Sequence, residues 1–261
     1  MTVVQAEWSV LLRRWSARAT LALSVLLPLL VLGIFRALGA EDAALQFNGK
    51  PVSEIVDLTA ANAATAALGV RNAIVMPVLF LLLAGQVMAG ERSSHVLREH
   101  LVRPIGRGRV LWGKVAAVWG LGAIGLGLHA VVTLGVGSLV LDTGDGWRSV
   151  LAGHAASMVS DLALVVFGFF LACHLKSAVG VLAVGLGMMG VDWVLRIGLS
   201  GLRFVGVESA EWVLPIMPGT GLGWYDIDGA SVAVPALAGL CVWVGAMAAM
   251  AHRRIHRMDV H

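Results

Sequence analysis

The sequence predicts an all-α integral membrane protein with six transmembrane helices. Of its 261 residues, 58% are hydrophobic and only 13% are charged, and the mean hydropathy is +0.85. A soluble domain usually has about 25% charged residues and about 45–50% apolar residues. The apolar residues gather in runs of about 20, the length that a helix needs to cross a bilayer. Composition and run length together therefore favour a membrane-spanning helical domain.

Six apolar runs are long enough to span the membrane. They lie at about 19–38, 72–90, 110–141, 150–174, 177–198 and 232–251. The third run is longer than a bilayer requires, so we expect it to tilt or to begin in the interface. Because these runs are spread along the whole chain, we expect residues 1–261 to form a single transmembrane domain.

The charged residues divide the connections into two kinds. Basic residues occur at Arg13, Arg14, Arg18, the block from Arg92 to Lys114, Lys176, Arg253, Arg254 and Arg257. The other connections are acidic and contain Glu41, Asp57, Asp142 and Glu208, among others. Cytoplasmic loops are enriched in Lys and Arg, so we expect a multi-pass protein of the cell inner (cytoplasmic) membrane with both termini in the cytoplasm. The same rule accounts for the +3 net charge, and we expect no nucleic-acid partner.

Residues 1–18 are expected to form an amphipathic helix that contacts membrane lipid. One face of this helix would carry Val4, Trp8, Leu11, Leu12 and Trp15. The opposite face would carry mostly Glu7, Arg14 and Arg18. Tryptophans at headgroup depth and arginines near anionic lipid are typical of an interface helix. A frayed cytoplasmic tail is the alternative.

The sequence predicts the structure of two external segments. "KPVSEIVDLTAANAATAALGVRN" opens with Pro51 and a capping Ser53, and its alanines favour an external helix that leads into the second run. Residues 199–231 contain Pro215, Pro218 and several glycines, which predict an external or re-entrant loop.

A basic block separates the second run from the third. The stretch "GERSSHVLREHLVRPIGRGRVLWGK", residues 90–114, contains six arginines and lysines. We expect Glu91 to Arg103 to form one cytoplasmic helix, which Pro104 ends because proline cannot continue a helix interior. Gly106 and Gly108 then allow the chain to turn before the third run. The alternative is a basic loop that only satisfies the positive-inside rule.

The order of residues in this block resembles a family pattern. An acidic residue ends a span, a leucine follows six positions later, and then come Pro-x-x-Arg and Gly-Lys. The matching residues are Glu91, Leu97, Pro104, Ile105, Arg107, Gly113 and Lys114. This order is similar to E-x-x-x-G-T-L, P-[VI]-x-R and G-K of the ABC-2 permeases, the membrane subunits of ATP-binding cassette transporters. His95 and Val96 stand where that family usually has Gly-Thr.

The resemblance implies a coupling helix at 91–103 that sits in a groove of an ABC ATPase subunit. The residues implied in this contact are Glu91, Arg92, His95, Arg98, Glu99, Arg103 and Arg107. The chain has no G-x-x-x-x-G-K-[ST] loop to bind phosphates, so we expect ATP and Mg²⁺ on the partner ATPase and no cofactor on this chain. The resemblance also implies a permease homodimer or heterodimer that works as an exporter.

Charged and polar residues inside the runs are further candidates, because an ionisable group at bilayer depth is costly. Asp192 and Arg196 lie one helical turn apart, so we expect an internal ion pair. His129 and Asp161 either line a substrate path or make polar contacts between helices. The glycines of the third run serve either a dimer seam or packing within the chain.

Two other classes of protein are alternatives to an ABC permease. An ATP-independent secondary transporter or channel is the main alternative, although the sequence has no inverted repeat. An intramembrane enzyme is less favoured because no G-x-S-x-G stretch occurs and no residues have metal-ligand spacing. Cys173 and Cys241 both lie in apolar runs and indicate neither a disulfide framework nor a metal site.

Overall fold

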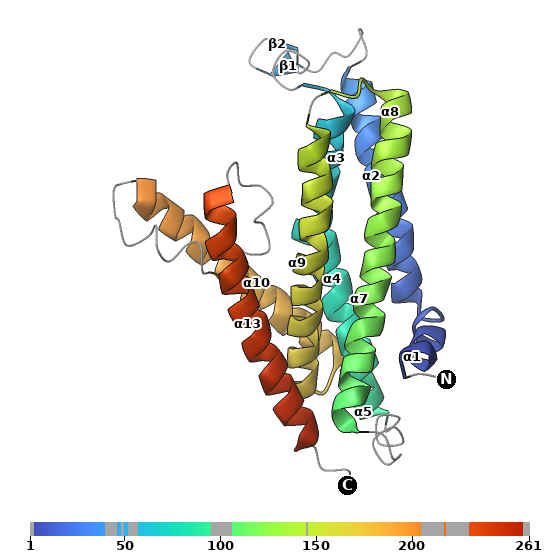
Figure 1. The fold of residues 1–261 in the computed structure, drawn as a ribbon, viewed down its shortest axis with the longest axis vertical. Coiled ribbons are helices and arrows are strands. Elements are labelled where there is room, and N and C mark those ends of the chain that lie inside the picture. Colours follow the sequence, from blue (N-terminus) through green and yellow to red (C-terminus); the bar gives the residue numbers. More distant parts are fainter. Residues whose placement is uncertain are drawn as a thin grey trace.

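Long helices make up most of the computed structural model (Figure 1). The structure describes residues 3–39, 46–47, 50–51, 57–94, 106–144, 146–204, 217 and 230–257. The α-helices are α1 Val3–Leu11, α2 Trp15–Leu38, α3 Ala60–Val70, α4 Met76–Ala84, α5 Glu91–Ser93, α7 Arg107–Val131, α8 Gly137–Val140, α9 Trp147–His174, α10 Ala178–Phe204 and α13 Ala230–His256. The π-helical turns are η2 Arg71–Val75, η3 Gly85–Gly90 and η4 Val132–Val136.

The helical fold class is confirmed, with one small addition. Strands β1 Gln46–Phe47 and β2 Lys50–Pro51 form a two-stranded antiparallel pair near the upper end of the bundle in Figure 1. With only two residues in each strand, this pair adds little to the architecture. It lies in the connection between α2 and α3, which the sequence predicts to be external.

Five helices within the described ranges are long and apolar enough to cross a membrane. They are Trp15–Leu38, Ala60–Ser93, Arg107–Val140, Trp147–His174 and Ala178–Ser200. The sixth predicted run falls within α13, a helix of 27 residues that is not among these five. A sixth membrane span therefore stays a prediction.

The predicted boundaries need three corrections. The expected external helix and the second run form one continuous 34-residue helix, Ala60–Ser93, because α3, η2 and α4 follow one another without a helix end between them. Residues 199–204 belong to α10 rather than to a loop. The helix expected over 1–18 is two helices, because the chain turns between Leu11 and Trp15.

The polarity predicted for the N-terminal helix is also wrong in part. Glu7, predicted on the polar face, is buried at 7% exposure. The reason is electrostatic: α1 packs against α7 and directs Glu7 towards a buried lysine there. Leu11, predicted on the lipid-facing side, packs into the protein core at 2% exposure, whereas Leu12 and Trp15 stay exposed, as lipid-facing side chains would be.

The core lies where α4 is surrounded by α7, α9 and α10. Phe80, Leu83 and Phe169 are almost completely buried there. A Cβ atom on Gly122 of α7 would lie 2.6 Å from the Phe80 ring, and one on Gly125 would lie 2.6 Å from the Ser24 hydroxyl of α2. These two glycines of the third run therefore permit packing within the chain, which decides between the two roles that the sequence leaves open for them.

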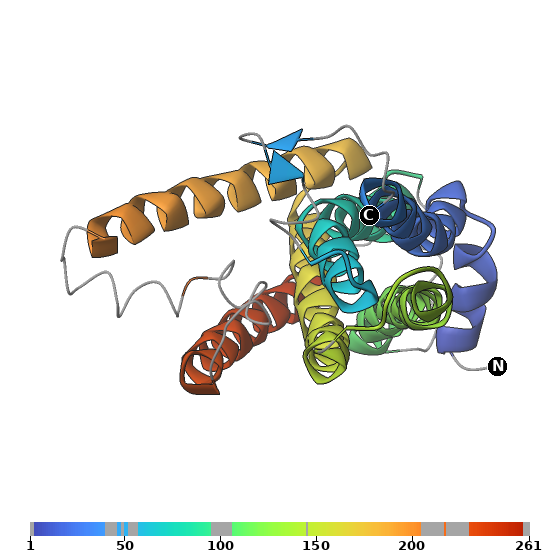
Figure 2. The same ribbon diagram turned by 90° about the horizontal axis from the view of Figure 1, so that it is seen from above.

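Two helices contact this core near one end and diverge from it along the rest of their length. Figures 1 and 2 both show α10 and α13 diverging from the bundle formed by α2, α4, α7 and α9. Along the membrane-spanning part of α10, only 11% of the residues are buried. Most of its apolar surface is thus available to lipid or to another protein.

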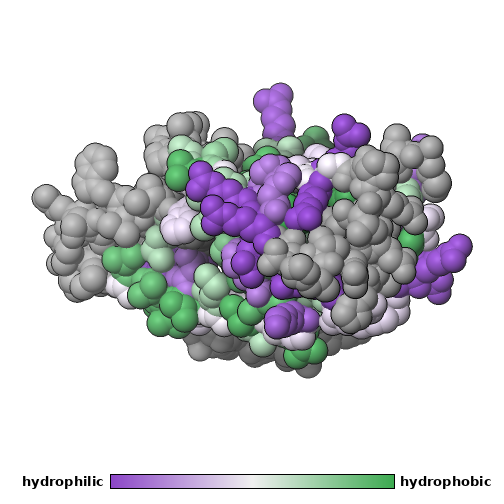
Figure 3. Space-filling model, turned by 90° about the horizontal axis from the view of Figure 1, so that it is seen from below, coloured by the Kyte–Doolittle hydropathy of each residue, from purple (hydrophilic) through white to green (hydrophobic). Residues whose placement is uncertain are grey.

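Basic residues gather at one end of the bundle. We call the lower end of Figure 1 the basic end: α1, α5, the start of α7 and the C-terminal end of α13 lie there. Exposed basic residues at this end include Arg109, Arg253, Arg254 and Arg257. Figure 3 views the same end from below, and hydrophilic residues occupy the middle of that face. Helix α1 and the end of α13 lie at this same end, and the side of the membrane that it faces stays a prediction.

Candidate functional site

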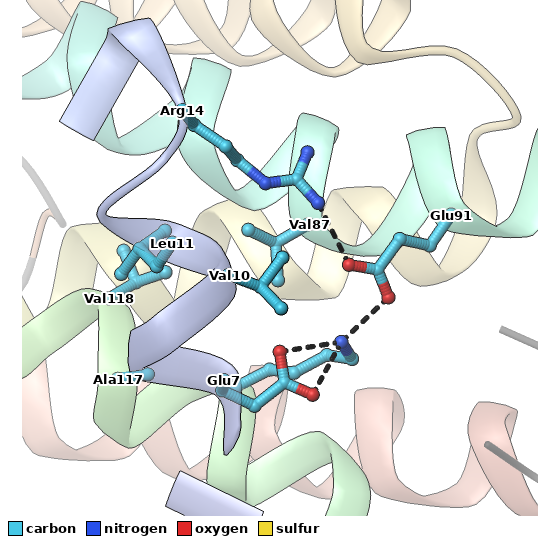
Figure 4. A pocket seen from close by; sticks show the side chains of 9 residues that line it. Glu7, Val10, Leu11, Arg14, Val87, Glu91, Ala117 and Val118 are labelled. Atoms are coloured by element: carbon cyan, nitrogen blue, oxygen red, sulfur yellow. Dashed lines mark hydrogen bonds and ion pairs between the residues drawn. The ribbon is translucent and has the colours of Figure 1, made fainter. Parts of the chain in front are cut away.

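Four charged side chains from distant parts of the chain meet at the basic end (Figure 4). We call Glu7, Arg14, Glu91 and Lys114 the charge network. Nζ of Lys114 lies 2.8 and 2.9 Å from the two carboxylate oxygens of Glu7, and 2.7 Å from Oε2 of Glu91. These contacts match the three N–H donors of an ammonium group. The lysine thus joins α1 to the end of the helix that contains η3 and α5.

Arg14 completes the network from the turn between α1 and α2. Its NH2 group donates to Oε1 of Glu91 at 2.9 Å, and its NH1 group donates to the Gln86 carbonyl at 3.1 Å. The Ser16 hydroxyl donates to the side-chain oxygen of Gln86 at 2.6 Å. The turn is therefore fastened to η3 and α5 at the end where α2 begins.

The network is electrically balanced and largely excluded from water. Two carboxylates face two cations, Lys114 is 0% exposed and Glu91 is 7% exposed. Removing one partner of a buried ion pair leaves an unpaired charge and typically costs about 3–5 kcal/mol. Removing opposite charges together costs less, so the four groups should behave as a unit.

The network lies at the two ends of the segment that the sequence singles out. Glu91 begins α5, and Lys114 is in the second turn of α7, so their ion pair closes the chain on either side of residues 95–105. Those residues lie outside the described part of the chain. The predicted contact residues His95, Arg98, Glu99 and Arg103 lie among them.

The other predicted contact residues lie beside the network. Arg92 donates to the Cys173 carbonyl at the end of α9, at 3.4 Å, and Arg107 donates to the His256 carbonyl at the end of α13, at 3.0 Å. Both carboxylate oxygens of Glu91 already accept hydrogen bonds inside the protein. Glu91 is therefore a partner of Lys114 and Arg14 in this structure, not an exposed contact residue.

A cavity of about 480 Å³ borders the network. Residues of α1, the turn after it, η3, α5, the residue after α5 and the start of α10 line this space. They are Ala6, Glu7, Val10, Arg14, Gln86, Gly90, Glu91, Ser94 and Ala178. This space is open to the surface and lies between part of α1 and η3, beside the apolar contact of Val10 and Leu11 with Val87.

A second polar cluster lies deeper, between the helices. Arg71 at the start of η2 forms a two-pronged ion pair with Asp161 of α9, with N···O distances of 2.7 and 3.3 Å. Both residues are almost completely buried. Asn72 accepts a hydrogen bond from Arg71 and donates one to the Ser157 hydroxyl. Asp161, which the sequence marks as a candidate, is thus satisfied by a contact between helices.

His129 has a similar contact. Its Nδ1 lies 3.2 Å from Nε2 of His154, whose Nδ1 lies 2.8 Å from the Val150 carbonyl. A carbonyl only accepts, so in neutral rings His154 Nδ1 carries the proton and His129 Nδ1 donates to His154. Within the described residues, no group of three or more metal-ligating side chains occurs. This pair therefore connects α7 to α9.

The predicted ion pair in α10 is confirmed. Nε of Arg196 lies 3.0 Å from Oδ2 of Asp192, one helical turn away, and both side chains are partly exposed. The pairing of Arg71 was not predicted, because this residue lies just before the apolar run at 72–90. Glu7 was predicted on the polar face of an interface helix, and Lys114 only as the last residue of the basic block, so their ion pair was not predicted either.

The fold and these buried ion pairs define a multi-pass helical membrane protein whose polar contacts join its helices. A sequence comparison gives its family: residues 3–191, well over half of the chain, match the model of the ABC-2 family transporter proteins. The chain belongs to this family. A search of curated proteins found no match.

Proposed function

We propose that this chain is the permease subunit of an ABC exporter and that a separate ATPase subunit drives it from the basic end. The observation that carries the proposal is the Glu91–Lys114 pair, because it brings together the two ends of the segment that resembles a coupling helix. The family match includes this whole segment. On this proposal, ATP and Mg²⁺ bind to the ATPase, and this chain binds neither.

The charge of the basic end supports the location of the ATPase. Exposed arginines surround the start of α7 and the end of α13, as Arg109, Arg253 and Arg254 illustrate. Such a surface attracts an acidic groove and speeds association with it. The positive-inside rule places the same surface in the cytoplasm, where ATP is available.

A second permease copy, identical or related, would complete the membrane unit. Asp192 and Arg196 lie on α10, whose other side chains are mostly exposed. Ionisable groups at bilayer depth normally face protein or a water-filled cavity. A partner chain packed beside α10 would provide that environment, and the path for exported cargo would run between the two copies.

The test is purification of the tagged chain from its native membranes in mild detergent. We expect an ATP-hydrolysing polypeptide with a phosphate-binding loop to co-purify, and vanadate to inhibit the hydrolysis. A complex without such a polypeptide, together with transport driven by an ion gradient alone, would contradict the proposal. That result would favour a secondary transporter, in which buried ionisable groups such as Arg71 and Asp161 often take part.

A further inference from the structure

Helix α1 packs apolar side chains against α7, and charged groups connect it to η3 and α5. Glu7 of α1 reaches Lys114 of α7, which lies 107 residues away, and Lys114 also contacts Glu91. An open groove of about 480 Å³ runs beside part of α1 on the side of η3. On that side the charge network connects α1 to Glu91, which lies four residues before the segment 95–105.

We propose that Lys114 is a positioning residue for coupling. Through its ion pairs with Glu7 and Glu91, Lys114 makes α1 move together with Glu91 when an ATPase displaces residues 95–105. This inference rests on the proposed function, because the ATPase supplies the displacement. It adds α1 to the elements that move, and it assigns a role to a lysine that lies inside the protein rather than at the contact surface.

The energetics favour a positional role over a purely stabilising one. Apolar residues of similar volume often replace a buried ion pair at no cost in stability, so burial alone does not explain why charges occupy this site. Charged groups do fix which surfaces meet and in which register. Lys114 satisfies two carboxylates at once, so a shift of Glu91 that leaves Glu7 behind would break a buried contact.

The helix that leads to Glu91 also has a local structure suited to movement. The π-helical turn η3 runs from Gly85 to Gly90 and ends at the residue before Glu91. Single π-helical turns interrupt the regular hydrogen bonding of a helix and are frequent at functional sites. A Cβ atom on Gly90 would meet only the Gly85 carbonyl oxygen, at 3.7 Å, so no side chain packs against Gly90 itself.

The first experiment uses the permease alone in lipid nanodiscs. Spin labels at Ser9 of α1 and Ser93 of α5, both exposed, report the distance between the two elements after Cys173 and Cys241 are replaced. We expect a narrow distance distribution in the parent chain and a broad one in Lys114→Met. Arg148→Met, which removes an exposed arginine at the opposite end, is the matched control and should leave the distribution narrow. An unchanged distribution in Lys114→Met would overturn the inference.

A double variant separates positioning from charge balance. Lys114→Met alone leaves an excess negative charge, whereas Glu7→Gln with Lys114→Met leaves Glu91 paired with Arg14 and restores neutrality. We expect the double variant to recover the membrane yield of the parent chain while its distance distribution stays broad. A narrow distribution in the double variant would mean that Lys114 only neutralises the two acids, and would overturn the inference.

The second experiment uses the complex with the co-purified ATPase, trapped with ADP and vanadate. A third label at Ser149 of α9 lies at the opposite end of the bundle. In the parent complex, trapping should shift the Ser9–Ser149 and Ser93–Ser149 distances together. In the double variant, the nucleotide-dependent shift of the Ser9 distance should be lost, while the shift of the Ser93 distance remains.

The outcomes distinguish this inference from the proposed function. If no ATPase co-purifies with the parent chain, the proposed function fails, whatever the distances in the permease alone. If the complex hydrolyses ATP and Ser93 moves while Ser9 stays in place, the proposed function stands and the role of Lys114 is refuted. Equal movement of Ser9 in the parent and the double variant would refute it as well.

Discussion

At the scale of single residues, buried charges in this protein occur with their partners. Arg71 and Asp161 illustrate the rule most fully, because both are fully enclosed between helices and form two N···O contacts. In a bilayer there is little water to solvate a charge that loses its partner, so such pairs should respond strongly to single substitutions.

We predict that Arg71→Met and Asp161→Asn each destabilise the protein by about 3–5 kcal/mol, because each leaves the charge of the other residue unpaired in an environment without water. The double variant should be closer to the parent chain than either single variant. Unfolding in mixed detergent micelles measures the effect. If the stability losses of the two single variants simply add in the double variant, the two groups are stabilised separately.

The ion pair of α10 provides a comparison. Asp192→Asn with Arg196→Gln should express better than either single change, but the differences should be smaller than at Arg71 and Asp161 because the α10 pair is partly exposed. Membrane yield of the three variants is the measurement. Identical yields would show that the two side chains are solvated independently.

These residues also show how far sequence reasoning reaches. The Asp192–Arg196 pair was predictable because both members lie in one helix at a fixed spacing. The partners of Asp161 and Lys114 come from other helices, and no local spacing specifies which helices pack together. Their positions within apolar runs indicate only that each needs a partner.

At the scale of elements, glycines and π-helical turns determine how closely the helices approach. Each π-helical turn lies beside a buried polar group: η2 contains Arg71, η3 ends before Glu91, and η4 begins three residues after His129. Pro77, two residues beyond η2, cannot donate to the preceding turn, which gives a physical reason for the change in hydrogen bonding there. For η3 and η4 the apolar pattern contained no comparable signal, so the sequence predicted uninterrupted helices.

We predict that Gly122→Leu destabilises the bundle by about 1–3 kcal/mol, because the added side chain overlaps the Phe80 ring and overpacks the core. Gly127→Leu is the matched control in the same helix, since a Cβ atom there meets no neighbour within 4 Å. Thermal inactivation in detergent compares the two. A larger loss at Gly127 would contradict the packing of α7 described above.

At the scale of the whole molecule, the placement of charges along the chain agrees with the arrangement of the helices. The connections predicted to be cytoplasmic lie at the basic end, together with α1 and the end of α13 (Figure 1). The number of long apolar helices was largely predictable because run length and bilayer thickness are directly related. The divergence of α10 and α13 was not, because a lipid-facing helix and a partner-facing helix have the same composition.

We predict that His100 and both termini face the cytoplasm, and that residues 45, 145 and 220 face the outside. Single cysteines at these positions, introduced after Cys173 and Cys241 are replaced, test the topology with a membrane-impermeant reagent on intact cells. Labelling of position 100 from outside would overturn this orientation and the location proposed for the ATPase.

The central claim is that residues 91–103 contact an ATPase, and charge reversal in the middle of this segment tests it most directly. Arg98→Glu with Glu99→Arg keeps the net charge and changes no residue of the predicted spans, so insertion should be unchanged. Interface energy is usually concentrated in a few residues, and we expect ATPase binding to weaken at least about tenfold. The measurement is pull-down of the ATPase together with its hydrolysis rate in nanodiscs, normalised to the permease yield. Weakened binding at normal yield is the predicted result, whereas normal binding and normal hydrolysis would contradict the coupling role.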